Sequence, residues 1–253
     1  MPSPGSPLPE MAQFRIEIAG QVFFVTSLFD SSRDYCREYL TEQAPDFSVA
    51  VTPADLAFEQ AFLDEEAEQE GFRRRVFTDP FLDRAAIQRK VAEHLFGCGT
   101  LLIHGSAVAL AGKGYLFTAK SGTGKSTHTR YWLEEFGSQA AIINDDKPFI
   151  RMDGACPLLC GAPWSGKHGL HRNLTVPLAG ICILERGERD RILPIRPEEA
   201  LPMLLHQASP PLDAEKQPEF ADLVERLANA VPLWRMECTK SPAAAHIARG
   251  AMG

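Results

Sequence analysis

The chain has 253 residues, long enough for one large α/β domain or for a core domain with a smaller attachment, and its 45% hydrophobic and 23% charged residues are typical of a soluble globular protein. Its net charge is −7 and its basic residues form no long run, so we expect no binding to nucleic acid or to an anionic membrane. No apolar stretch reaches the roughly 18 residues of a membrane span, and residues 1–10 lack the pattern of a signal peptide. We therefore predict a cytoplasmic protein whose first ten residues form a disordered tail.

Residues 11–80 are predicted to form a small N-terminal α+β cap. Residues 14–18 and 22–25 alternate apolar and polar side chains around Ala19-Gly20, which is typical of a β-hairpin. The other elements expected here are a helix over 32–40, a strand over 47–51, and helices over 53–69 and 79–97. The last of these leads into a larger domain, predicted over residues 81–253.

The larger domain is predicted to contain short strands over 100–103, 106–110 and 115–118. Tight turns join them, and tight turns favour antiparallel pairing, because parallel strands need long crossovers. We therefore expect an α/β fold that leans toward α+β, with mixed and largely antiparallel sheets. The later elements are expected in chain order as a helix over 125–136, strands over 140–144, 148–152, 158–160 and 179–185, helices over 196–206 and 218–230, a strand over 231–238 and a helix after 242.

A glycine-rich loop, Ala119-Lys-Ser-Gly-Thr-Gly-Lys-Ser126, lies between an expected strand and an expected helix. It matches the phosphate-binding pattern G-x-x-x-x-G-K-[ST], except that Ala119 replaces the first glycine, where a positive φ would disfavour alanine. The glycines let backbone N–H groups turn toward an anion, and the helix N-terminus adds partial positive charge. The residues predicted to bind nucleotide are Ser121, Gly122, Thr123, Gly124, Lys125, Ser126 and Thr127. The alternative is a glycine-rich turn with an incidental lysine.

An acidic pair, Asp145-Asp146, ends the apolar strand expected over 140–144, about twenty residues beyond the loop lysine. Carboxylate oxygens suit Mg²⁺, which Ser126 and Asp145 are predicted to hold. A second carboxylate can accept the proton of an acceptor hydroxyl. The alternative is a plain turn, which Asn144, Asp145 and Asp146 would also favour.

Three motifs together resemble the catalytic domain of HPr kinase/phosphorylase, which is related to the phosphoenolpyruvate carboxykinases: Ile103-His104-Gly105, the loop Ser121–Ser126 and the acidic pair. The resemblance covers roughly residues 95–185. It implies that Lys125 and Ser126 bind phosphate and Mg²⁺, that Asp146 accepts the acceptor's proton, and that His104 lies beside Asp146. Lys125, Asp146 and His104 are thus the predicted catalytic residues. Outside the family, His104 would be an ordinary strand histidine.

The segment from Cys160 to Asn173 is a predicted loop rich in glycine, cations and imidazoles. Lys167 and Arg172 are candidates for contact with the phosphoryl group or an anionic acceptor, and Trp164 and His168 complete the predicted substrate set. The alternative is a solvated surface loop. HPr-phosphorylating members carry a metal-binding glutamate here, in an Arg-Gly-Leu-Gly context that this chain lacks. The N-terminal 80 residues also differ from that enzyme's N-terminal domain, which implies another acceptor.

The sequence thus predicts a kinase that uses ATP and Mg²⁺ to phosphorylate a hydroxyl of a small molecule or of a peptide serine. The partners expected are a nucleoside triphosphate and this acceptor, with a homo-oligomer left open. Two alternatives remain: a protein serine kinase/phosphorylase of the HPr kinase type, and a nucleotide-binding regulatory module without turnover. A carboxykinase-type reaction would need more metal ligands than the sequence offers. The residues that contact the base, and the choice of ATP over a donor such as pyrophosphate, are not identified.

Overall fold

The computed structural model describes residues 11–69, 71–152, 154 and 156–253. The predicted disordered tail, residues 1–10, lies outside this part of the chain. Contacts divide the chain into two compact units, residues 1–94 and 95–253. The predicted boundary after residue 80 lies at the start of α3 (Asp79–Phe96), whereas this division lies near its end. Among the described residues, no helix is long and apolar enough to cross a membrane.

The first unit contains a three-stranded sheet in which β2 lies between β1 and β3. Its elements are β1 (Ala12–Ile18), β2 (Gln21–Ser27), α1 (Asp30–Tyr35), η1 (Arg37–Tyr39), β3 (Phe47–Ala50), α2 (Pro53–Gln69) and α3. The predicted hairpin is confirmed, since β1 and β2 pair antiparallel and Ala19 and Gly20 both have positive φ. The single helix expected over 32–40 is wrong. The chain tightens after α1, where the Tyr39 N–H donates to the Cys36 carbonyl three residues back, as in a 3₁₀ turn.

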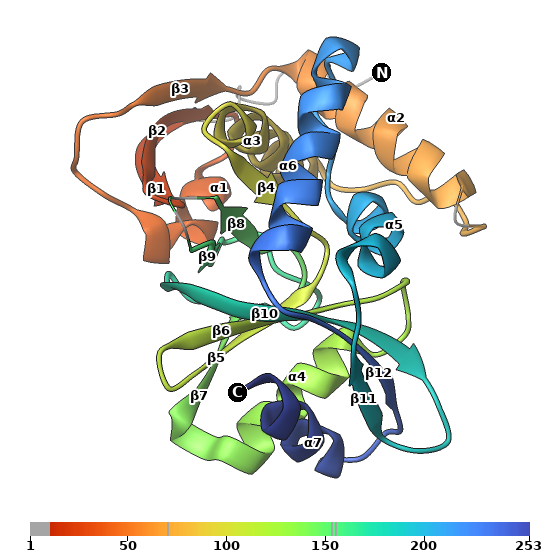
Figure 1. Ribbon diagram of the computed structural model, residues 1–253. Coiled ribbons are helices and arrows are strands. Elements are labelled where there is room, and N and C mark those ends of the chain that lie inside the picture. Colours follow the sequence, from red (N-terminus) through yellow and green to blue (C-terminus); the bar gives the residue numbers. More distant parts are fainter. Residues whose placement is uncertain (1–10, 70, 153, 155) are drawn as a thin grey trace. The chain divides into compact units, whose positions relative to one another are not determined.

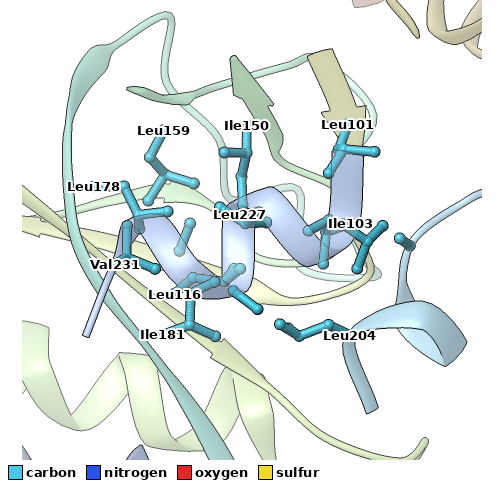
Figure 2. Close-up of a cluster of buried hydrophobic side chains, with 14 of the residues drawn as sticks. Leu101, Ile103, Leu116, Ile150, Leu159, Leu178, Ile181, Leu204, Leu227 and Val231 are labelled. Carbon is cyan, nitrogen blue, oxygen red and sulfur yellow. The ribbon is translucent and has the colours of Figure 1, made fainter. Parts of the chain in front are cut away.

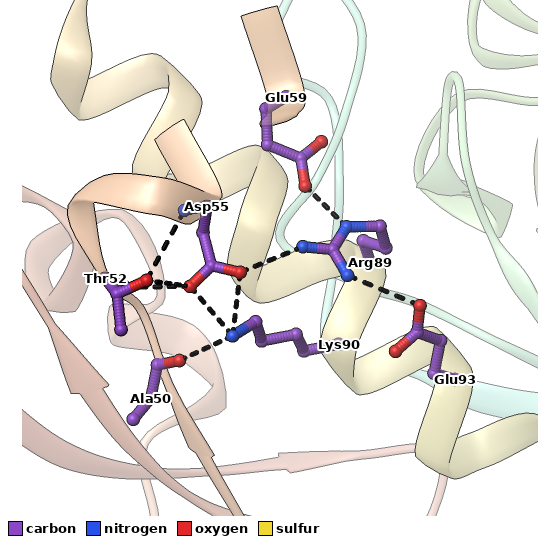
Figure 3. A network of polar contacts seen from close by, with 7 residues as sticks. All are labelled: Ala50, Thr52, Asp55, Glu59, Arg89, Lys90 and Glu93. Carbon is purple, nitrogen blue, oxygen red and sulfur yellow. Dashed lines mark hydrogen bonds and ion pairs between the residues drawn. The ribbon is translucent and has the colours of Figure 1, made fainter. Parts of the chain in front are cut away.

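An ionic network joins α2, α3 and the end of β3 within this unit (Figure 3). Arg89 contacts Glu59 at 2.6 Å and Asp55 at 3.2 Å. Lys90 contacts Asp55 at 2.8 Å and donates to the Ala50 carbonyl at 2.8 Å. Burial acts to raise the pKa of Asp55, but hydrogen bonds from Lys90 and Thr52 outweigh it and lower the pKa to about 2. The network holds two long helices and a strand in one arrangement.

The second unit is a mixed α/β fold, as predicted. Its strands connect in the order β4-β8-β9-β10-β6-β5-β7, with β12 beside β10 and β11 beside β12. Its elements are β4 (Thr100–Leu102), β5 (Ser106–Leu110), β6 (Lys113–Thr118), α4 (Lys125–Phe136), η2 (Gly137–Gln139), β7 (Ala140–Asn144), β8 (Phe149–Arg151), β9 (Leu158–Cys160), β10 (Thr175–Arg186), β11 (Arg191–Pro194), α5 (Pro197–Gln207), η3 (Ala214–Lys216), α6 (Gln217–Ala230), β12 (Leu233–Cys238) and α7 (Ala243–Met252).

Two apolar clusters cover the two faces of the sheet that contains β6. On one face, α5 and α6 pack with β4, β8 and β9, and side chains such as Leu116, Ile181 and Leu227 lie at the centre of the cluster (Figure 2). On the other face, α4 and α7 pack against Phe117 and Cys182 (Figure 1). Cys182 is thus a buried core residue. Helices on both faces leave the edge where the strands end as the place for a site.

The pairing of the strands differs from expectation in one respect. The β5–β6 hairpin is antiparallel as predicted, but β4 pairs with β8 and not with β5. The chain leaves the β4 ladder at Ile103, whose N–H donates to the Pro148 carbonyl, and enters β5 only after His104-Gly105. The strand predicted over 179–185 is also longer than expected, since β10 begins at Thr175 and ends at Arg186. Its first part pairs with β9, and its remainder pairs in parallel with β6 and β12.

Candidate functional site

Four strands of the second unit end at one edge of the sheet. β10 is parallel to β6 and to β12. β5 is antiparallel to both β6 and β7, so β7 runs in the same direction as β6. The C-terminal ends of β6, β7, β10 and β12 therefore lie at the same edge, which we call the phosphate edge. In open α/β sheets, ligands bind at the carboxyl ends of such strands.

The glycine-rich loop follows β6 at the phosphate edge and leads into α4. Gly122 and Gly124 have φ of 74° and 118°, which L side chains rarely adopt, so glycine is required at both positions. Ala119 is buried and lies outside the positive-φ region, so alanine at the first motif position costs no backbone strain. The Lys125 side chain folds back, and Nζ donates to the Ala119 carbonyl at 3.0 Å. A lysine thus lies across a loop at the start of a helix, where anions bind.

The loop and the acidic pair are in contact. The Ser126 hydroxyl donates to the Asp145 carbonyl at 3.2 Å, which joins the start of α4 to the end of β7. Burial acts to raise the pKa of Asp146, but the hydrogen bond from His104 and the charges of Lys147 and Lys125 outweigh it, so the pKa of Asp146 is lowered. The structure therefore brings together Lys125, Ser126, Asp145 and Asp146.

Asn144 fixes the turn that carries the acidic pair, and it is fully buried. Its Oδ1 accepts from the N–H groups of Asp146 at 2.9 Å and Lys147 at 2.7 Å. Its Nδ2 donates to the carbonyls of Ala162 at 2.8 Å and Trp164 at 3.0 Å. All the bonding capacity of the amide is used. The sequence around Asn144 predicts only a turn, because the hydrogen-bond partners at Ala162 and Trp164 lie about twenty residues along the chain.

Asp145 has the environment of a cation ligand. Its Oδ1 accepts from the Gly166 N–H at 2.7 Å. Its Oδ2 is buried and, among the described residues, has no hydrogen-bond partner. Burial raises the pKa of Asp145, the Gly166 hydrogen bond opposes that rise, and the charge of Asp146 adds to it. A buried carboxylate oxygen without a partner is costly unless a cation or proton compensates it.

The donor set fits Mg²⁺ in the form in which it accompanies phosphates. Within the described residues no group of three or more His, Cys, Asp or Glu side chains could hold a metal ion. Mg²⁺ commonly binds through one or two carboxylates, with the remaining positions taken by water and substrate phosphates. The Asp145 carboxylate and the Ser126 hydroxyl, whose residues are already in contact, would supply the protein's share of such a site.

Asp146 lies beside His104 in the turn formed by residues 144–147, which we call the acidic turn. His104 Nε2 lies 3.3 Å from Asp146 Oδ1, and both side chains are about one third exposed, at 37% and 33%. The next residue, Gly105, packs so closely against Leu116 that a side chain would not fit, since a Cβ there would lie 2.7 Å from Leu116 Cδ1. The Gly105 N–H donates to the Asp146 carbonyl at 2.8 Å. Asp146 is therefore oriented by an imidazole and remains accessible to a ligand.

The segment of residues 160–173, which we call the substrate loop, runs beside β7. The Arg172 N–H donates to the Ile143 carbonyl at 3.0 Å, and the Asp145 N–H donates to the Leu170 carbonyl at 3.1 Å. His168 is near enough for its charge to lower the pKa of Asp145, one of the weaker effects on that group. Lys167, His168 and Arg172 are exposed. Their contact with a substrate stays a prediction.

Trp164 is a packing residue in the structure. Its side chain is buried, and its ring meets Phe149 edge-on with centroids 6.4 Å apart. Its carbonyl accepts from Asn144. The buried ring leaves little surface for stacking on a base or an acceptor, so the burial gives no support to its predicted substrate role.

The residues at the ends of β10 and β12 were not predicted as site residues. Arg186 ends β10, and its guanidinium donates at 2.5 Å to the carbonyl of Gly122. Gly122 belongs to the glycine-rich loop, residues 119–126, which we also call the phosphate loop. Cys238 ends β12, and Thr239 and Lys240 follow it. No motif marks these positions. A cation at the end of an apolar strand is only a weak indication of a site residue. It indicates a place beside the phosphate loop only once β10 and β12 are known to run in the same direction as β6.

Comparison with known proteins identifies no family for the chain. No protein-family model matches the sequence, and no curated protein matches it. Among solved structures, the chain is similar to the Hpr(Ser) kinase/phosphatase from Coxiella burnetii, with a TM-score of 0.36 and 10% sequence identity, over 59% of this chain and 95% of that one. A TM-score of this size carries no argument, so function has to be inferred from the chain's own residues.

Proposed function

We propose that the chain is a kinase that uses ATP and Mg²⁺ to phosphorylate a hydroxyl of a small molecule or of a peptide serine. The observation that carries this proposal is the contact between the phosphate loop and the acidic turn, through Ser126 and Asp145. A loop of this kind alone would support phosphate binding. A loop that contacts the backbone of the turn carrying a buried carboxylate and a second, accessible carboxylate also supports transfer.

The loop residues would bind and orient the donor. Backbone N–H groups around Gly122 and Gly124 would surround the β- and γ-phosphates, and Lys125 would exchange its Ala119 contact for a phosphate oxygen. Mg²⁺, held by Ser126 and Asp145, would neutralise charge that develops between the β- and γ-phosphates. Phosphoryl transfer depends mainly on such positioning and electrostatic stabilisation.

Asp146 would act as the base toward the acceptor. The acceptor's O–H bond breaks and its proton passes to the Asp146 carboxylate. The acceptor oxygen forms a bond to the γ-phosphorus while the bond from the γ-phosphorus to the β–γ bridging oxygen breaks, and ADP leaves with the electron pair of that second bond. The lowered pKa of Asp146 keeps the carboxylate ionised at neutral pH, and His104 orients it.

Replacement of Asp146 by asparagine tests the proposal. We expect Asp146→Asn to keep ATP/Mg²⁺ binding, measured by thermal shift, and to reduce acceptor-dependent ADP release by about 10²–10⁴-fold, the usual contribution of a general base. The acceptor is sought in a panel of hydroxyl compounds that includes free serine and seryl peptides.

The matched control is Asp222→Asn, which changes an exposed carboxylate on α6 and should alter neither quantity. An unimpaired rate in Asp146→Asn would remove Asp146 from the mechanism. Tight ATP binding by the unaltered chain without release of ADP for any acceptor would favour a regulatory module.

A further inference from the structure

A pocket of about 380 Å³ lies at the phosphate edge beside the loop, on the side of β10 and β12. Its wall includes Gly122 to Gly124 of the loop, and Thr127 and Tyr131 on α4. The opposite wall comes from Arg186-Gly187 and from residues 238–240. Its volume lies within the range of about 300–1,000 Å³ that is usual for small-molecule sites. Lys125, Ser126 and the acidic pair are not among the described residues that line it.

The pocket and the acidic turn lie on opposite sides of the phosphate loop. In the sheet, β6 has β5 and then β7 on one side, and β10 and then β12 on the other. The acidic turn follows β7, so it lies on the first side of the loop, and the pocket lies on the second. A ligand that places its terminal phosphate at the acidic turn and extends across the loop would bring its other end into the pocket.

The walls of the pocket are held by contacts that need no ligand. Asp190 accepts from the Thr239 N–H at 2.7 Å and from the Thr239 hydroxyl at 3.1 Å. The Gly187 N–H donates to the Cys238 carbonyl at 3.2 Å. Arg186 closes the gap to the loop through the Gly122 carbonyl. A preformed site costs less ordering when a ligand binds.

The chemistry of the wall suits a nucleoside better than a second polyphosphate. Tyr131 is half-buried and offers aromatic surface to a base. Arg186 and Lys240 are exposed cations that can contact the phosphate nearest the sugar. Thr239 also lines the pocket, and its hydroxyl oxygen, which donates to Asp190, can still accept a hydrogen bond from a ribose hydroxyl.

We propose that this pocket binds the base and ribose of the donor nucleotide, so that the acceptor enters on the opposite side of the loop, beside His104 and Asp146. The inference rests on the proposed function only in requiring that the loop binds the polyphosphate. It assigns the residues that select a nucleotide over pyrophosphate or tripolyphosphate as donor.

The first test compares ADP with inorganic tripolyphosphate, each with Mg²⁺, by calorimetry. We expect Tyr131→Ala to weaken ADP binding by about tenfold, because it removes the surface on which the base would stack, and to change tripolyphosphate binding by less than about twofold. The matched control is Lys216→Ala, which removes an exposed lysine from η3 and should leave both affinities unchanged. Equal loss for both ligands, or no loss for ADP, would overturn the proposal.

The second test uses the Cys238 thiol, which lies in the pocket and is partly exposed. With the exposed Cys98 and Cys156 replaced by serine, alkylation of Cys238 should slow several-fold with saturating ADP/Mg²⁺, and should not slow with tripolyphosphate/Mg²⁺. Equal protection by both ligands, or by neither although both bind, would place the nucleoside elsewhere. If the unaltered chain binds neither ligand, the proposed function itself fails together with this inference.

Discussion

Asn144 is the residue on which the geometry of the acidic turn depends most directly. It carries no charge, yet it holds the backbone of Asp146 and Lys147 on one side and two carbonyls of the substrate loop on the other. Because the whole amide is buried, each of these bonds lacks a water substitute. This one side chain therefore fixes the backbone of the turn from which both carboxylates extend.

Asn144→Asp is expected to destabilise the protein by about 3 kcal/mol or more. The substitution turns two donated hydrogen bonds into contacts between a carboxylate and the carbonyls of Ala162 and Trp164. Urea unfolding measures the change. Asn229→Asp is the matched control, since Asn229 is exposed on α6 and donates to the Glu225 carbonyl, and it should cost less than about 1 kcal/mol. Similar costs for both substitutions would contradict the role given to Asn144.

His128 adds a pH-dependent contribution one turn into α4. Burial lowers the pKa of His128 to about 4, with a smaller opposing effect of Asp190. Its Nε2 accepts from the Trp132 indole N–H at 3.3 Å, which requires the neutral ring. Below about pH 6.5, the pKa of this histidine in the unfolded chain, the unfolded chain binds a proton at His128 that the folded chain does not bind. This histidine therefore costs stability as pH falls from about 6.5 to about 4, and costs nothing above that window.

The stability lost through His128 over that window should amount to about 3 kcal/mol. His128→Gln should flatten this part of the pH profile, whatever its effect on stability at pH 8. His206→Gln, at an exposed position on α5, should leave the profile unchanged. Urea midpoints at several pH values between 4 and 8 provide the comparison. Identical slopes for His128→Gln and the unaltered chain would show that the imidazole is not held neutral.

At the scale of elements, the seam between β7 and the substrate loop places the site. Gly161 lies where the first and last parts of the substrate loop meet beside β7, since a Cβ there would lie 1.9 Å from the Arg172 carbonyl oxygen and 3.2 Å from the Ile143 carbonyl oxygen. The Gly161 N–H also donates to the Leu174 carbonyl at 2.9 Å. No side chain fits at this position unless the two backbone segments move apart, and that movement would displace the turn held by Asn144.

Gly161→Ala is expected to destabilise the protein by about 2 kcal/mol or more, and to weaken acceptor-dependent turnover in parallel. Gly250→Ala is the matched control. Gly250 lies within α7, where a Cβ would meet nothing within 4 Å, so alanine should be neutral or stabilise by up to about 1 kcal/mol. Chemical unfolding of both variants decides the point, and a tolerated Gly161→Ala would mean that the seam is loose.

Local signals in the sequence identified most elements, and tertiary pairing explains the failures. The bounds of α4 and β7 were predicted to the residue, because the glycine loop, the apolar run and the acidic end mark them. β11 was missed, because its side chains are mostly exposed and only its pairing with β12 makes it a strand. The partner of β4 was wrong, since pairing with β8 depends on a contact about fifty residues along the chain.

At the scale of the whole molecule, one edge of the sheet gathers segments that are far apart in the sequence. The phosphate loop, the acidic turn, Arg186 and Thr239 all meet there because four strands run in the same direction. The loop and the acidic pair could be predicted from sequence because each is a contiguous motif. The pocket could not, because its walls come from three separate strand ends and one helix. The first unit is held by its own ionic network, and its predicted role as a cap stays a prediction.

The central claim is that a loop holding a polyphosphate faces the buried Asp145 carboxylate across a Mg²⁺ ion. Calorimetry of ATP binding, with and without Mg²⁺, tests it most directly when the unaltered chain is compared with Asp145→Asn. We predict that Mg²⁺ strengthens ATP binding at least about tenfold in the unaltered chain, and that Asp145→Asn loses most of this gain while binding without Mg²⁺ is kept. The same gain from Mg²⁺ in both proteins would contradict the account.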